Sequence, residues 1–194
     1  LGKHFRNHES IFLDGAKEVG QKFTFAASFR ADNFDWFHTS YTGSADLKYR
    51  IKEGNTLTFG VAKTMRIPTF TELYYNDPTT VGDPWLWEEK AVNYQVGYTY
   101  KKEGLSLGTT IFFRDESDII DWVKHAPLQP RWQAENLPGS EVLGTESYFS
   151  YNINKRVVLS GNYTYINKYG DDQGFLYKYG PNHLRHLANL NLRF

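Results

Sequence analysis

Apolar and polar side chains alternate along most of this chain with a period of two residues, which is typical of β-strands that have one apolar face. The alternation is cleanest from Val92 to Tyr100, where every second side chain is apolar or aromatic and the others are Asn, Gln, Gly and Thr. Segments of this kind predict about nine strands, and patterns typical of helices are almost absent. The predicted strands cover residues 4–13, 22–30, 39–51, 56–65, 91–100, 105–124, 131–151, 156–167 and 183–194.

The connections between the predicted strands alternate between short and long. The short, polar turns lie at 52–55, 101–104 and 152–155, and 14–21 is a somewhat longer member of this set. The long links are 31–38, 66–90, 125–130 and 168–182. A sheet with tight turns on one rim and loops on the other has this arrangement. The pattern therefore predicts an all-β fold, an antiparallel up-and-down meander.

Two of the predicted strands, 105–124 and 131–151, are longer than the roughly 9–11 residues that a strand needs to cross a bilayer. We expect them to project beyond the others as a ribbon, with residues 125–130 at its tip. Alternation alone does not separate a membrane barrel from a soluble sandwich, because both bury one face of a sheet. A soluble carbohydrate-binding β-sandwich therefore stays open as an alternative.

Composition narrows the classes of function. The 22 Lys and Arg residues balance the 22 Asp and Glu residues, so the net charge does not favour a nucleic acid partner. Aromatic residues make up 17 % of the chain, and Tyr and Trp suit a membrane interface because each ring carries a polar atom. Cysteine is absent, which excludes a disulfide framework and a thiolate metal site. No apolar run reaches the roughly 18 residues of a spanning helix.

Four ordered motifs carry more specific information than the alternation. The first, at 66–74, reads Arg-x-Pro-x-x-x-Glu-Leu-Tyr, and the second, at 82–89, reads Gly-Asp-Pro-x-Leu-x-Glu-Glu. The third, at 111–122, contains Phe-Phe-Arg-Asp and ends in Ile-Asp-Trp, and the fourth, at 132–146, contains Glu-Asn and Gly-Thr-Glu. This order resembles the β-barrel of TonB-dependent outer-membrane receptors.

The resemblance implies that residues 1–194 are part of the C-terminal barrel domain of such a receptor, and therefore a segment of a larger transmembrane β-barrel. Barrels of this kind close with on the order of 22 strands, so the chain is expected to be an internal piece of a longer protein. The expected location is the outer membrane of a Gram-negative bacterium. Nothing in the sequence matches the plug domain that precedes the barrel in this family.

The function implied by the resemblance is energy-coupled uptake of a scarce nutrient, with a ferric siderophore as the first candidate and cobalamin as the second. The expected partners are outer-membrane lipid, the nutrient ligand and, only through the missing plug, the TonB complex. Haem receptors of the family place a His between the first two motifs, and the segment 68–82 has none. Asp83 and Glu88 stand where the family usually has Asn and Pro.

Seven side chains in the predicted loops are candidates for ligand contact, because aromatic faces and a guanidinium suit a planar or anionic chelate. They are Arg66, Tyr74, Tyr75, Trp85, Trp87, Trp122 and Trp132. The competing interpretation is that the aromatic residues pack the loops against one another and that Arg66 forms a structural ion pair.

No metal site, cofactor or catalytic site is predicted. His183 and His186 fall on opposite faces of a strand, and His4 and His8 lie roughly 13 Å apart along one, too far to chelate one ion. The acidic residues between 115 and 121 offer oxygen ligands for Ca²⁺, but the glycine of a calcium loop is missing. A hydrolase built in a membrane barrel is the other alternative. It requires convergent Ser, His and Asp residues, or paired carboxylates on adjacent strands near the outer rim, and the sequence shows no such set.

Overall fold

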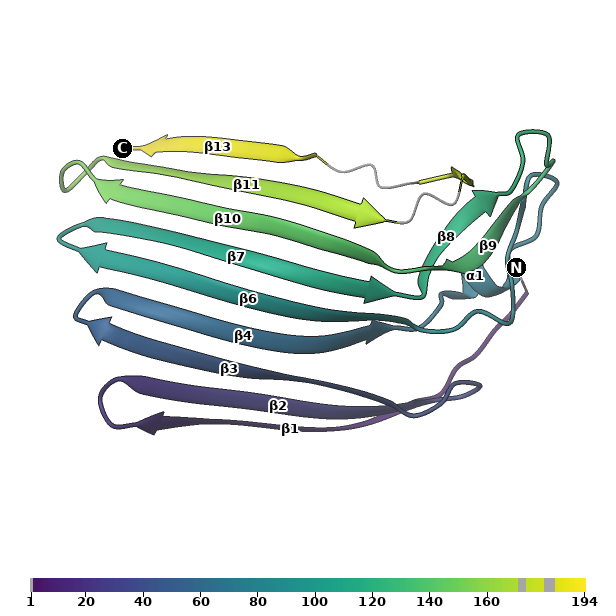
Figure 1. Cartoon of the computed structure of the whole chain (residues 1–194), viewed down its shortest axis with the longest axis horizontal. Helices are drawn as coiled ribbons and strands as arrows, with labels where there is room; N and C mark the ends of the chain where they lie inside the picture. The colour runs from purple at the N-terminus through teal and green to yellow at the C-terminus, as the bar shows by residue number, and fades with distance from the viewer. Residues whose placement is uncertain (1, 171–173, 180–183) are drawn as a thin grey trace.

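A computed structural model describes residues 2–170, 174–179 and 184–194, and its main feature is a single antiparallel sheet (Figure 1). Within these residues the sheet has nine strands in the order β1-β2-β3-β4-β6-β7-β10-β11-β13, so each pairs with its neighbours along the meander. They are β1 (His8–Val19), β2 (Phe23–Phe34), β3 (Ser40–Lys52), β4 (Asn55–Arg66), β6 (Glu89–Lys102), β7 (Leu105–Ser117), β10 (Ser140–Asn152), β11 (Val158–Gly170) and β13 (His186–Arg193). The predicted all-β meander is confirmed.

Tight turns join the strands at one rim of the sheet. Gly20, Gly54 and Gly104 have φ angles of 60°, 73° and 82°, a left-handed conformation that glycine adopts without steric cost. The predicted turn at 14–21 is wrong, because β1 continues to Val19, which lies opposite Phe23. The run of charged and small residues in this stretch weakens the alternation, but the backbone ladder continues through it because it does not depend on side-chain type.

A smaller sheet stands at the other end of the strands (Figure 1). Its order is β12 (Leu176–Tyr177), β8 (Ile119–Lys124), β9 (Trp132–Leu137) and β5 (Thr80–Val81). A short helix, α1 (Phe70–Tyr74), lies beside it. The main buried cluster lies here and consists of Leu73, Leu86, Ile120, Trp122 and Ala134. The apolar core of the described residues therefore lies among the loops and not on the large sheet.

The predicted ribbon is a separate hairpin and not an extension of two long strands. The strand predicted at 105–124 divides into β7 and β8 at Asp118, which has a φ angle of 56°. The strand predicted at 131–151 divides into β9 and β10 at Pro138 and Gly139. Positive φ is uncommon for a residue other than glycine, and proline cannot donate to a strand ladder. Both breaks therefore have local causes.

One face of the large sheet is apolar and uncovered by the described residues. Phe25, Leu47, Phe59, Val96 and Ile111 are successive cross-strand partners on this face, and all except Leu47 are exposed. A soluble sandwich buries such a face against a second sheet, whereas a membrane barrel presents it to lipid. Among the described helices, none has the length and apolar character needed to cross a membrane.

Candidate functional site

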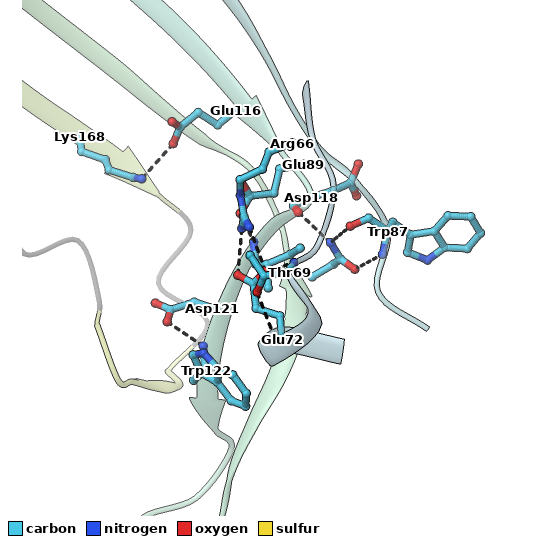
Figure 2. Close-up of polar contacts among 12 residues, drawn as sticks. Arg66, Thr69, Glu72, Trp87, Glu89, Glu116, Asp118, Asp121, Trp122 and Lys168 are labelled. Carbon is cyan, nitrogen blue, oxygen red and sulfur yellow. Dashed lines mark hydrogen bonds and ion pairs between the residues drawn. The ribbon is translucent and has the colours of Figure 1, made fainter. Parts of the chain in front are cut away.

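Arg66, the last residue of β4, is the centre of a charged junction beside the small sheet (Figure 2). Its Nε and Nη2 atoms donate to the carboxylate oxygens of Glu89 at 2.7 and 2.6 Å. Its Nη1 and Nη2 atoms donate to those of Glu72 at 2.9 and 3.0 Å. The side chains of Glu72 and Glu89 are 14 % and 22 % exposed, and that of Arg66 is 41 % exposed. These contacts confirm the ion pair predicted as the structural role of Arg66.

The two carboxylates extend this junction to α1 and β8. Glu72 Oε2 accepts the N–H of Thr69 at 2.7 Å, and the Thr69 hydroxyl accepts the N–H of Glu72 at 3.2 Å, which forms a capping box at the start of α1. Glu89 Oε1 accepts the N–H of Ile120 at 2.8 Å. Burial raises the pKa of Glu72, but hydrogen bonds from Arg66 and Thr69 outweigh burial and hold it below the usual 4.5. One guanidinium thus joins β4, α1, β6 and β8.

The second sequence motif closes the other end of α1. The N–H of Gly82 donates to the carbonyl of Tyr75 at 2.7 Å, and the N–H of Asp83 donates to that of Glu72 at 2.9 Å. The last carbonyls of a helix have no partner within the helix, so these bonds satisfy groups that α1 leaves open. The two backbones touch, because a Cβ on Gly82 would collide with the carbonyl of Glu72.

Two of the seven ligand candidates, Trp122 and Trp132, pack within the hairpin of β8 and β9. Trp122 is 7 % exposed, and the ring of Tyr75 meets it edge-on with the centroids 6.5 Å apart. Lys178 Nζ lies 5.5 Å from the ring centroid of Trp122, and Lys124 Nζ lies 4.9 Å from that of Trp132. These are cation–π contacts, so side chains of this chain already cover part of both indoles.

Three other candidates lie nearer the surface. Trp85 and Trp87 are 84 % and 61 % exposed, and the Trp87 ring points away from the charged junction (Figure 2). Leu86, between them, belongs to the buried cluster. Tyr74 is more covered, because the ring of His4 stacks on it with the centroids 4.0 Å apart. Trp85 and Trp87 are therefore the most accessible of the seven, and the ligand role of all seven stays a prediction.

A family model for the β-barrel of TonB dependent receptor-like proteins matches residues 3–194. The chain belongs to the TonB-dependent receptor family. Members of this family are transport receptors, and they are outer-membrane proteins of Gram-negative bacteria. The motifs that meet at Arg66 and at Gly82 are therefore the motifs of a receptor barrel.

Two curated relatives are the ferrienterobactin receptor of Escherichia coli (strain K12), 20 % identical over 182 residues, and the vitamin B12 transporter of Vibrio vulnificus (strain CMCP6), 23 % identical over 148 residues. These matches cover 82 % and 74 % of this chain but only 24 % and 23 % of the relatives. The chain thus spans about a quarter of the length of these receptors.

Solved structures share the barrel fold of this receptor segment. A ferric enterobactin receptor in complex with BCV-L6 aligns with a TM-score of 0.80 at 20 % identity, over 96 % of this chain and 30 % of that one. The siderophore receptor PirA from Pseudomonas aeruginosa aligns with a TM-score of 0.74 at 21 % identity, over 84 % of this chain and 32 % of that one. The comparisons do not support the carbohydrate-binding sandwich.

Arg6 is a receptor residue that the sequence pattern does not single out. Its guanidinium carbon lies 5.0 Å from the ring centroid of Phe37 and 4.9 Å from that of Phe70, and its Nη1 donates to the carbonyl of Pro68 at 3.0 Å. The segment before β1 is thereby joined to the loop between β2 and β3 and to α1. Strand periodicity carries no signal for a contact among three loops that are distant in sequence.

The acidic and histidine residues considered as metal ligands make separate contacts in this receptor segment. Glu116 pairs with Lys168 at 2.9 Å, and His8 Nε2 lies 2.6 Å from Asp32. His183 lies outside the described residues. Within the part of the chain that the structure describes, no group of three His, Cys, Asp or Glu side chains is arranged to hold a metal ion.

Asp77 organises the turn that leads into β5. Its Oδ1 accepts the N–H groups of Thr79 and Thr80 at 2.6 and 2.7 Å, and its Oδ2 accepts the hydroxyl of Tyr75 at 2.8 Å. These bonds, first the one from the N–H of Thr79, lower the pKa of Asp77 from 3.8 to about 2. The carboxylate is therefore the form that the folded turn favours.

We expect this turn to lose stability only in strong acid. Because the pKa of Asp77 is lower in the folded than in the unfolded state, its stabilisation is complete above pH 3.8 and is lost as the pH falls toward 2. A titration of the ¹³C shift of the Asp77 carboxyl should have its midpoint near the lower value. Thr79→Ala, which removes a hydroxyl that donates at 2.8 Å, should raise the midpoint. A wild-type midpoint at 3.8 would contradict the role given to the hydrogen bonds of Asp77 in this turn.

Proposed function

We propose that the chain is part of a receptor in the outer membrane of a Gram-negative bacterium that takes up a ferric siderophore by energy-coupled transport. The observation that supports this most is the family match over residues 3–194. Relatives and structures named as ferric enterobactin and siderophore receptors favour a ferric siderophore as the nutrient. The relative named as a vitamin B12 transporter makes cobalamin the second candidate.

In this proposal the apolar face of the large sheet contacts outer-membrane lipid. The exposed side chains of Phe25, Phe59, Val96 and Ile111 on that face are of the kind that a barrel presents to hydrocarbon. The segment forms part of the barrel wall and its loops, and coupling to the TonB complex takes place through a plug domain of the whole receptor.

The ligand surface in this proposal is formed by Trp85 and Trp87. Both rings are largely exposed, and the segment between them is fixed by the burial of Leu86. A rigid aromatic face stacks on a planar or amphipathic ligand at a low cost in side-chain entropy. A ferric chelate with aromatic arms and a corrin ring both offer such planar faces.

Uptake by the whole receptor tests the function. The receptor is expressed in a Gram-negative strain that lacks its own siderophore and cobalamin receptors, and uptake of iron-labelled ferric enterobactin is measured with and without TonB. Uptake that requires TonB is the expected result. Uptake of labelled cyanocobalamin instead would select the second candidate, and uptake of neither would overturn the proposal.

Replacing both Trp85 and Trp87 with alanine should weaken binding of ferric enterobactin to the whole receptor about 100-fold, because each stacked ring contributes roughly 1.4 kcal/mol. The measurement is equilibrium binding of iron-labelled ligand to the receptor in detergent. Trp36→Ala is the matched control, because Trp36 is 91 % exposed in the loop between β2 and β3, and it should bind as the wild type does. Wild-type affinity in the double variant would rule out ligand contact by these rings.

A further inference from the structure

The side chain of Asn136, near the end of β9, binds two backbone segments that are distant in sequence. Its Oδ1 accepts the N–H of Trp87 at 2.7 Å, and its Nδ2 donates to the carbonyl of Trp87 at 3.2 Å. The same Nδ2 donates to the carbonyl of Asp118 at 2.8 Å. Figure 2 shows Trp87 and Asp118 approaching each other from different segments. One amide therefore connects three parts of the loop region.

These bonds use both the acceptor oxygen and the N–H donors of the Asn136 side-chain amide. The group has one acceptor oxygen and two N–H donors, so it pairs with both backbone groups of Trp87 in the way that a neighbouring strand pairs in a sheet. Trp87 lies outside the strands, two residues before the start of β6 at Glu89. Its backbone has no ladder partner there, and Asn136 supplies one.

The third bond fixes the corner between β7 and β8. Asp118 has a φ angle of 56°, and a residue other than glycine keeps this conformation only when its surroundings enforce it. On one side of the corner the carbonyl of Asp118 is bound by Asn136, and on the other the N–H of Ile120 is bound by Glu89 at 2.8 Å. The hairpin and the Trp87 segment are thus held in one relative position.

We propose that Asn136 is a positioning residue that holds the Trp87 ring in place for the nutrient ligand, an inference that rests on the function proposed above. The chain around Trp87 is held at two points. Asn136 binds the backbone of Trp87 itself, and Glu89, two residues later in the chain, binds Arg66. The Trp87 ring is 61 % exposed and is not held by the buried cluster. The backbone of Trp87 therefore sets the position of its Cβ, and with it the space that the ring can reach.

Hydrogen exchange at the Trp87 amide tests the positioning without any ligand. In the whole receptor in detergent, Asn136→Ala should speed exchange of this amide by about tenfold or more, because the Trp87 N–H loses the oxygen that accepts its hydrogen bond. Asn136→Asp keeps an acceptor and removes both donors, so its effect should be smaller. Gln133→Ala, which truncates an exposed amide side chain on the same strand, should have no effect. Unchanged exchange in a folded Asn136→Ala receptor would overturn the proposal.

A double-mutant cycle tests whether Asn136 acts through Trp87. Ferric enterobactin is the probe, and affinity is measured for the wild type, Asn136→Ala, Trp87→Ala and the double variant. We expect Asn136→Ala to weaken binding several-fold and to have no further effect in the Trp87→Ala background. Effects that multiply would show that Asn136 acts elsewhere and would overturn the proposal. Absence of binding in the wild type would reject the siderophore function, while the exchange result would still decide the positioning.

Discussion

Replacing Arg66 with alanine should abolish most nutrient uptake by the whole receptor while the large sheet stays folded. The variant leaves Glu72 and Glu89 without the four hydrogen bonds that Arg66 donates, and it leaves two like charges close together at a site where each carboxylate is mostly buried. Removing one member of a buried ion pair lowers the free energy of unfolding by about 3–5 kcal/mol, because the other charge is left buried without a partner. Because Arg66 is 41 % exposed, we expect about 2 kcal/mol, which still exceeds the stability of most loops.

The local loss should be visible in hydrogen exchange before it is visible in overall unfolding. The amides of Thr69 and Ile120 donate to the two carboxylates, and a loss of about 2 kcal/mol corresponds to roughly 30-fold faster exchange. Arg66→Lys should be intermediate, because an ammonium keeps the charge but cannot bridge both carboxylates with a planar fork. Lys63→Ala, which removes an exposed cation from the same strand, is the control. Slow exchange of both amides in Arg66→Ala would show that the guanidinium does not hold the junction.

The sequence predicts the large sheet because the patterns that specify its strands and turns lie among residues that are close together in the chain. Alternation places side chains on two faces, and turn glycines such as Gly54 and Gly104 mark where strands end. The break at Asp118 has no such signal, because one aspartate within an alternating run does not by itself mark the φ angle of 56° that it adopts. The parallel pairing of Thr80 with Trp132 joins residues that no periodicity connects.

The candidate site is predicted in part for the same reason. The ion pair of Arg66 follows from its motif, and the capping box of α1 is present as Thr69 and Glu72, although five residues are too few for a helical period to show. The covering of Trp122 by Lys178 is not predictable, because the two residues are neighbours only after the small sheet has formed. The residue type of an aromatic side chain in a loop does not indicate whether that side chain is buried or exposed.

Gly82→Ala should disrupt the loop region almost as strongly as loss of Arg66, although it removes no side-chain contact. A new Cβ would collide with the carbonyl of Glu72 and approach the backbone of Leu73, and backbone cannot move aside as a flexible side chain does. Such overpacking costs about 1–3 kcal/mol. The bonds from Gly82 to Tyr75 and from Asp83 to Glu72 would lengthen with the collision, and α1 is too short to persist without them.

The measurement is hydrogen exchange at the amides of Leu73 and Tyr75, which donate to the carbonyls of Thr69 and Thr71 within α1. Both should exchange at least tenfold faster in Gly82→Ala. Gly15→Ala is the control, because a Cβ at Gly15 in β1 meets no atom within 4 Å, and it should leave both amides protected. Equal protection in the two variants would mean that the second motif does not require close backbone approach. Faster exchange in Gly82→Ala alone would explain why a glycine stands there although its φ angle is not positive.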